Sequence, residues 1–171
     1  MYHMSQTVPM KAYVLLFFAL VVINGYTYRA IVAPPVLEVR ILEAGKGAVT
    51  LIQHPDSGTL LVDTGSDASI LRALGLSLPM WQRDIDVVIL TSSDTLSTGG
   101  LRALEDRYVV RDIARFGVAI PYGAEVRFDE NTYIKVSGPQ RVVVSYGASV
   151  LSISSTTPSG AYHLDGTGLE K

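Results

Sequence analysis

Hydrophobic and polar positions divide the chain into an apolar N-terminal stretch and a longer part in which short apolar runs alternate with turns. The apolar run is unbroken from Ala12 to Ile23, and no charged residue lies between Lys11 and Arg29. A helix that crosses a bilayer needs about 20 mostly apolar residues. Such a segment can be drawn from Ala12 to about Ile31, so the pattern predicts one transmembrane helix and a single-pass membrane location.

Four parts follow from this division: an N-terminal segment (1–11), a transmembrane anchor (12–33), a folded domain (36–153) and a flexible tail rich in Ser, Thr and Gly (154–171). A cleaved signal peptide and a buried core helix are the alternatives for the anchor. Basic residues lie on both sides of the anchor, so the positive-inside rule does not say which side of the membrane the domain faces.

The folded part alternates between strand and helix patterns. Apolar runs with a period of two, or unbroken runs of strand length, predict strands, and two segments with helical spacing predict short helices. The expected strands are 36–45, 48–55, 59–65 and 84–91, the expected helices are 66–75 and 99–110, and hairpins are expected over 124–138 and 141–154. This order is typical of an α/β sandwich.

Composition narrows the functional classes. The 171 residues are 48% hydrophobic and 18% charged, which suits a globular core, and the net charge of -2 gives no reason to expect strong binding to nucleic acid. The chain has no cysteine, so disulfides, thiolate metal sites and cysteine nucleophiles are excluded. The arginines between Leu101 and Phe116 alternate with acidic residues, which is typical of a solvated charged face.

Three segments resemble the C-terminal metallo-β-lactamase-like domain of ComEC-type DNA-internalisation proteins. They are "LEAGKGAVTLI" (42–52), "LLVDTG" (60–65) and "LTSSDTLSTGG" (90–100), in the order and at the spacing that the family shows. The connecting text, "ILRALGLSLPMWQRDIDVVILT" (70–91), is similar to the family's helix, Trp-containing loop and buried strand. The resemblance implies a partial metallo-β-lactamase-like αββα sandwich preceded by one N-terminal transmembrane helix.

The same resemblance implies that the metal ligands are missing. The family's loop carries His, Asp, Asp and His around the metal, and here those places fall on Ser92, Asp94, Leu96 and Ser97. Asp63 is retained at the strand end, whereas the acidic place in the Gly-x-Gly-Asp turn falls on Ala48. A later Gly-Asp place falls on Ser154 and Ser155.

A catalytic metal needs about three or more N or O ligands and an open position for water. We therefore expect no cofactor and no catalytic residue, and interpret Asp63, Ser92, Asp94, Leu96 and Ser97 as vestigial site positions. The expected role is structural or regulatory, with an intact ComEC-type membrane protein as the partner that the resemblance suggests.

A second hypothesis belongs to another class of protein. "LLVDTGS" is also the strand of a retropepsin-like aspartic protease, in which Asp63 would be catalytic and a second copy of the chain would supply its twin. The helix pattern after Gly65 does not fit such a protease, which is nearly all β.

Single polar residues have simpler interpretations. Asp94 precedes a helix pattern and is expected to act as a cap or turn residue. No Gly-x-Ser-x-Gly elbow accompanies the loop serines. The three histidines, His3, His54 and His163, lie near the ends or in a turn and are expected to be exposed.

Overall fold

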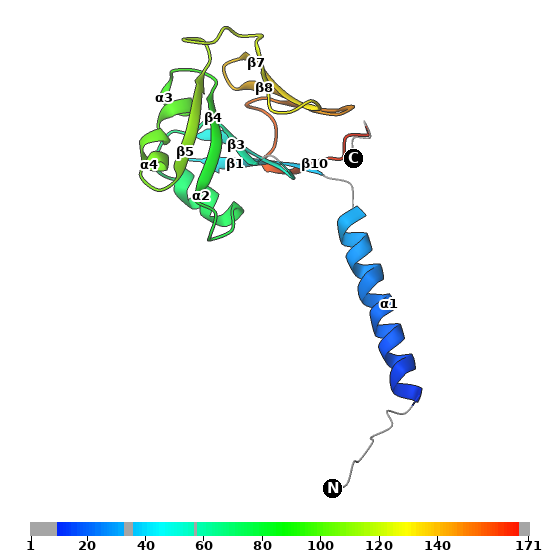
Figure 1. The fold of residues 1–171 in the computed structure, drawn as a ribbon. Coiled ribbons are helices and arrows are strands. Elements are labelled where there is room, and N and C mark those ends of the chain that lie inside the picture. The colour runs from blue at the N-terminus through cyan, green and yellow to red at the C-terminus, as the bar shows by residue number, and fades with distance from the viewer. Residues whose placement is uncertain (1–9, 33–35, 57, 168–171) are drawn as a thin grey trace. The chain divides into compact units, whose positions relative to one another are not determined.

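The computed structural model describes residues 10–32, 36–56 and 58–167 (Figure 1). The chain forms two compact units, Met1–Pro34 and Pro35–Lys171, with the boundary at the Pro34-Pro35 pair.

The N-terminal unit contains one helix, α1 (Met10–Val32). Its large apolar side chains from Tyr13 to Tyr26 are exposed, and the rings of Phe17 and Phe18 meet edge to face with their centroids 6.2 Å apart. In the residues that the structure describes, no helix has the length and apolar character that crossing a membrane requires. The transmembrane helix expected over residues 12–33 is therefore not found there.

The second unit is built on a six-stranded sheet with the order β10-β1-β2-β3-β4-β5. Strands β1 (Leu37–Ala44), β2 (Gly47–His54) and β3 (Gly58–Val62) form an antiparallel meander, and β4 (Asp84–Leu90) and β5 (Val109–Arg115) continue parallel to β3. Parallel neighbours need a crossover connection, and helices supply the connections on both sides of β4. The carboxyl ends of β3 and β4 therefore meet at one edge of the sheet.

Three short helices lie on one face of this sheet: α2 (Ile70–Ser77), α3 (Thr95–Thr98) and α4 (Leu101–Glu105) (Figure 1). Ile70 and Leu74 of α2 and Leu104 of α4 are fully buried there, in one cluster with apolar side chains of the sheet such as Leu51 and Val88. The apolar residues of α2 recur at helical spacing, which is why its inner face is continuous.

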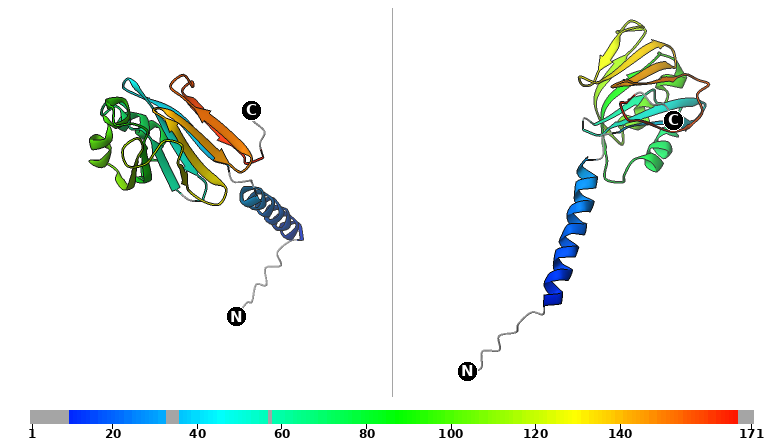
Figure 2. Two further views of the ribbon diagram at one scale, coloured as in Figure 1. Left: turned by 90° about the horizontal axis from the view of Figure 1, so that it is seen from above. Right: turned by 90° about the vertical axis from the view of Figure 1, so that its right-hand side faces the viewer.

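A four-stranded antiparallel sheet covers the other face of the six-stranded sheet (Figure 2). Its order is β6-β7-β8-β9, formed by β6 (Glu125–Arg127), β7 (Thr132–Gly138), β8 (Arg141–Tyr146) and β9 (Ser149–Ile153). A second core lies between the sheets, where Ile52 and Ile89 pack in one cluster with Ile134 and Val144. The described part of the unit thus has three layers, helices on sheet on sheet, and the expected α/β sandwich is confirmed at that level.

The expectation of a flexible tail over residues 154–171 is wrong for part of the tail. Residues Gly160–Leu164 form β10, which pairs antiparallel with β1, with Leu37 opposite Leu164 and Ile41 opposite Gly160. Leu164 is buried in the core between the sheets. The segment is held in place because it completes the edge of the six-stranded sheet beside β1.

Candidate functional site

Asp63 follows β3 directly and is held beneath the loop that follows β4. Its side chain is buried, and its backbone has φ of 60°, a left-handed conformation that is uncommon outside glycine. The carboxylate accepts two hydrogen bonds from one residue: Thr91 N–H donates to Oδ1 at 2.8 Å and the Thr91 hydroxyl donates to Oδ2 at 2.7 Å. The Asp63 N–H donates to the carbonyl of Ile89 at 2.8 Å. Asp63 thus ties the ends of β3 and β4 together.

Thr91 extends this tie to the second sheet. Its hydroxyl oxygen accepts a hydrogen bond from the N–H of Gln140 at 3.0 Å, and its carbonyl accepts one from the Tyr122 hydroxyl at 2.9 Å. Gln140 lies in the turn between β7 and β8 and also has a positive φ, 52°. Thr91 is fully buried and is the point where hydrogen bonds from both sheets meet. We call Asp63, Thr91, Gln140 and Tyr122 the strand-end junction.

The electrostatic state of Asp63 reflects its burial. Desolvation raises the pKa of the Asp63 carboxyl above its ordinary value of 3.8, and the nearby charge of Asp94 adds to the increase. Hydrogen bonds from Thr91 and from the Ser97 side chain act in the opposite direction and offset only part of it.

The four loop positions singled out from the resemblance lie together after β4. Ser92 donates to the hydroxyl of Ser97 at 3.0 Å, and Ser97 is fully buried. Asp94 is the N-cap of α3, where its Oδ1 accepts from the N–H of Ser97 at 3.0 Å. This confirms the expected capping role of Asp94. The Leu96 side chain is 37% exposed.

Two glycines allow this loop to lie against the turn after β3. The N–H of Gly100 donates to the carbonyl of Gly65 at 3.1 Å. A Cβ on Gly100 would lie 2.2 Å from the carbonyl oxygen of Thr64, and a Cβ on Gly99 would lie 2.2 Å from that of Ser66. The Gly-Gly pair is therefore required by close backbone contact.

The other positions implied by the resemblance, Ala48, Ser154 and Ser155, lie close to Asp63. A cavity of about 20 Å³, close to the size of one water molecule, is lined by residues of both sheets that include Ala48, Asp63, Gln140, Ser154 and Ser155. A larger cleft of about 300 Å³ shares Ala48, Gln140 and Ser155 with it. The fold thus brings residues 48, 63, 154 and 155 around one point.

The side chains around this cavity do not fit a catalytic metal as ligands. Both oxygens of Asp63 already accept hydrogen bonds from Thr91, Asp94 caps α3, and the remaining positions carry hydroxyl or aliphatic groups. Over residues 10–32, 36–56 and 58–167, no three His, Asp or Glu side chains are grouped so that they could hold a metal ion.

The aspartic protease alternative is not supported. Its mechanism needs two carboxylates that share a proton and face the substrate. Asp63 is 3% exposed, and both of its oxygens are engaged by Thr91 within the same chain. The helices on the six-stranded sheet also differ from the nearly all-β body of such a protease.

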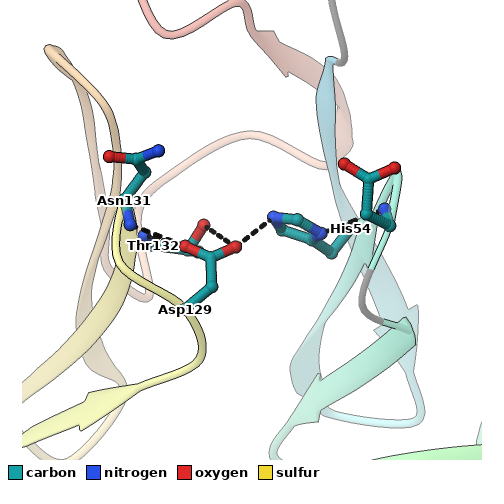
Figure 3. A network of polar contacts seen from close by, with 5 residues as sticks. His54, Asp129, Asn131 and Thr132 are labelled. Carbon is teal, nitrogen blue, oxygen red and sulfur yellow. Dashed lines mark hydrogen bonds and ion pairs between the residues drawn. The ribbon is translucent and has the colours of Figure 1, made fainter.

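The expectation that His54 is exposed is wrong (Figure 3). His54 ends β2 and is buried, with its ring between those of Phe128 and Tyr146 at centroid distances of 5.9 and 5.8 Å. Its Nδ1 accepts a hydrogen bond from the N–H of Asp56 at 3.1 Å, so in the neutral ring Nε2 carries the proton. That nitrogen lies 2.7 Å from Oδ2 of Asp129. His163, in contrast, is exposed on β10 as expected.

Asp129 is held from two sides in Figure 3. The N–H groups of Asn131 and Thr132 both donate to its Oδ1 at 2.7 Å. Partial desolvation would raise the pKa of Asp129, but these hydrogen bonds, the Thr132 hydroxyl and the charge of His54 outweigh it and lower the pKa below 3.8. The His54–Asp129 pair joins the β2–β3 turn to the β6–β7 turn. The Pro-Asp-Gly composition around His54 indicated only a turn, and no sequence signal showed that the second sheet covers it.

Part of this chain is similar in structure to solved proteins. No family model matches the sequence, and no curated protein matches it either. The chain is similar to a metallo-β-lactamase with a HARLDQ motif from Cronobacter sakazakii, with a TM-score of 0.47, 16% identity, and coverage of 74% of this chain and 65% of that one. For a mutant of that motif the TM-score is 0.41, with 18% identity and coverage of 66% and 57%. For a metallo-β-lactamase from Hirschia baltica it is 0.40, with 15% identity and coverage of 64% and 67%. The chain thus spans less than two thirds of the length of the two Cronobacter sakazakii structures.

Proposed function

We propose that this chain is a non-catalytic relative of the metallo-β-lactamase-like domain of ComEC-type proteins, with a structural or regulatory role. The family part of the proposal rests on the three sequence segments that resemble that domain. The non-catalytic part rests on what the retained acidic side chains do in the fold.

The observation that carries the proposal is the pairing of Asp63 with Thr91. A carboxylate that binds a metal must direct lone pairs at the ion. Asp63 accepts from the N–H and the hydroxyl of Thr91, at 2.8 and 2.7 Å, in a buried position, so one lone pair on each of its oxygens is already used. The hydrogen bonds that Thr91 receives from Gln140 and Tyr122 then hold both sheets at the place where a metal site would lie. The strand-end junction therefore acts as a structural connection.

The proposed partner and the proposed membrane location rest on the sequence resemblance alone. We expect the domain to dock with an intact ComEC-type membrane protein, and a membrane location stays a prediction to be tested on its own. Cell fractionation of the full chain tests it: the chain is expected in the membrane pellet after a carbonate wash. Recovery in the washed supernatant would contradict that location and leave the non-catalytic assignment intact.

Hydrolysis assays test the proposed lack of catalysis. Full-length protein is incubated with bis(p-nitrophenyl) phosphate and with nitrocefin, in the presence of Zn²⁺ or Mn²⁺, and compared with Asp63→Ala and with EDTA-treated protein. All samples are expected to match the protein-free blank. Turnover that EDTA abolishes and Asp63→Ala lacks would overturn the proposal.

The docking part has a separate test. Tagged full-length chain is co-expressed with a ComEC-type membrane protein, solubilised in mild detergent and purified through the tag. Co-purification at a constant ratio is expected, and an unrelated polytopic membrane protein serves as the control. Equal recovery of the control, or no recovery of either, would contradict the proposed partner.

A further inference from the structure

A further pocket lies at the opposite ends of the strands from Asp63. It has a volume of about 450 Å³ and is lined by seven residues from β3, β4, β5 and the loop before β4: Gly58, Thr59, Trp81, Gln82, Asp84, Asp86 and Arg111. This volume falls within the range of about 300 to 1,000 Å³ that is usual for small-molecule sites.

Four of these residues form a fixed polar framework. Oδ2 of Asp86 accepts from the N–H of Thr59 at 2.8 Å, and its Oδ1 lies 2.9 Å from a guanidinium nitrogen of Arg111. The Gln82 amide donates to the Thr59 hydroxyl at 2.6 Å. Gly58 leaves the room for this arrangement, because a Cβ there would lie 2.1 Å from Oδ2 of Asp86. Gln82 and Arg111 are thus each paired with another residue of the pocket lining.

Beside this framework stands a large flat ring. Trp81 is 84% exposed and is the only tryptophan in the chain. An indole ring exposed to that extent loses the hydrophobic stabilisation that its burial would give, and a ligand that covers one face of the ring restores it. Asp84, on the pocket wall, is also exposed and adds a carboxylate to the lining.

The hydrogen-bond donors and acceptors of the pocket indicate which class of ligand it can bind. Arg111 supplies donors, Asp84 supplies acceptors, and the Gln82 carbonyl oxygen is an acceptor because its amide nitrogen serves Thr59. A site for a simple cation presents mainly acceptors, and a site for a simple anion presents mainly donors. Neighbouring hydroxyl groups of a sugar both donate and accept, and the C–H face of a pyranose ring is flat and apolar like the indole.

We propose that this pocket binds a neutral saccharide, which stacks on Trp81 and is hydrogen-bonded by Gln82, Asp84 and Arg111. The pocket shares no residue with the strand-end junction. A negative result for saccharide binding would therefore leave the proposed lack of catalysis unaffected.

The single tryptophan makes the test direct. Full-length protein is titrated with cellotetraose, chitotetraose and maltotetraose while the fluorescence of Trp81 is recorded. A saturable change is expected with at least one of them. Calorimetry with that sugar is expected to show at least about tenfold weaker binding for Trp81→Ala and Asp84→Ala, and partial recovery for Trp81→Phe.

A variant outside the pocket and a simple organic cation serve as controls. Asp106→Asn changes an exposed aspartate at the end of α4, outside the pocket, and is expected to bind like the wild type. Tetramethylammonium chloride tests for a cation site. No saturable response to any of the three sugars, equal weakening by Asp106→Asn, or a response to tetramethylammonium alone would overturn the proposal.

Discussion

Asp63 and Thr91 are 28 positions apart in the sequence and form two hydrogen bonds with each other, one to each carboxylate oxygen of Asp63. The pair joins the ends of two parallel strands, and Thr91 passes the connection on to the second sheet through Gln140. A residue type that binds metals in many hydrolases thus serves here as an acceptor for the chain's own backbone and hydroxyl groups.

The Thr91 hydroxyl is expected to matter for stability through its hydrogen bonds. Thr91→Val keeps the shape of the side chain but leaves an oxygen of Asp63 and the N–H of Gln140 without their partner. Loss of a buried hydrogen-bond partner costs about 1 to 3 kcal/mol of free energy of unfolding. Thr91→Ser retains the hydroxyl and should lose less. Urea unfolding of the three proteins checks the order, and a valine variant as stable as the wild type would show that the bonds contribute nothing.

The pH dependence of stability should reveal the charge on Asp63. Its pKa is raised in the folded chain, so the folded state takes up a proton at higher pH than the unfolded state. The charged carboxylate therefore costs stability above the folded pKa, and this cost disappears as the pH falls below 3.8. Asp63→Asn carries no charge at any pH. Its free energy of unfolding minus that of the wild type should be most positive at neutral pH and should decrease as the pH falls.

Urea unfolding from pH 7 towards pH 4 measures this difference. Because only the difference between two variants is used, the titration of other carboxylates cancels. A difference that grows as the pH falls would contradict the direction of the pKa shift.

The His54–Asp129 pair is expected to contribute strongly to stability, because it joins the two sheets. His54→Ala removes a buried ring and leaves Asp129 and the N–H of Asp56 without that partner, so a loss of about 2 to 4 kcal/mol is expected. His163→Ala is the matched control, because His163 is exposed, and it should stay within about 0.5 kcal/mol of the wild type. Thermal and urea unfolding measure the stability of both variants. Equal losses of stability would contradict the proposed role of His54 in holding the two sheets together.

Two glycine substitutions should have opposite effects. Gly100→Ala places a Cβ 2.2 Å from the carbonyl oxygen of Thr64, so the backbone must shift and about 1 to 3 kcal/mol should be lost. Gly75 lies inside α2 with nothing within 4 Å of its Cβ position. Gly75→Ala should therefore be neutral or stabilising by up to about 1 kcal/mol. Equal destabilisation by both variants would contradict the close contact at Gly100.

Strand positions were predictable from the sequence because each early strand has its own periodic pattern. β1 alternates buried and partly exposed residues along most of its length, and β4 forms over the apolar run that predicted a strand there. The capping role of Asp94 was predictable for the same local reason, since it depends on a residue three positions later. These features need only short-range information.

Features that depend on distant parts of the chain were missed. The segment Gly160–Leu164 is short and lies in a polar region, and it becomes a strand only because the edge of β1 is open to it. His54 lies in a turn sequence, and its burial depends on Phe128 and Tyr146 of the other sheet. The helix expected over residues 66–75 begins later, at Ile70, after the N-cap Ser69, whose N–H donates to Asp67. The exact first turn depends on how the loop packs.

The family pattern also suggests a reconstruction. Ser92→His combined with Leu96→Asp restores two of the ligand types that the resemblance implies, at positions that are not fully buried. This variant should bind Zn²⁺ more tightly than the wild type and should be stabilised by it. Its folding is checked by circular dichroism.

Calorimetric titration of the full-length wild type with Zn²⁺ and Mn²⁺, with the reconstructed variant as positive control, tests whether the side chains around Asp63 can bind a metal ion. We expect no stoichiometric binding to the wild type and measurable binding to the reconstructed variant. Tight, one-to-one binding to the wild type that Asp63→Ala removes would contradict this expectation.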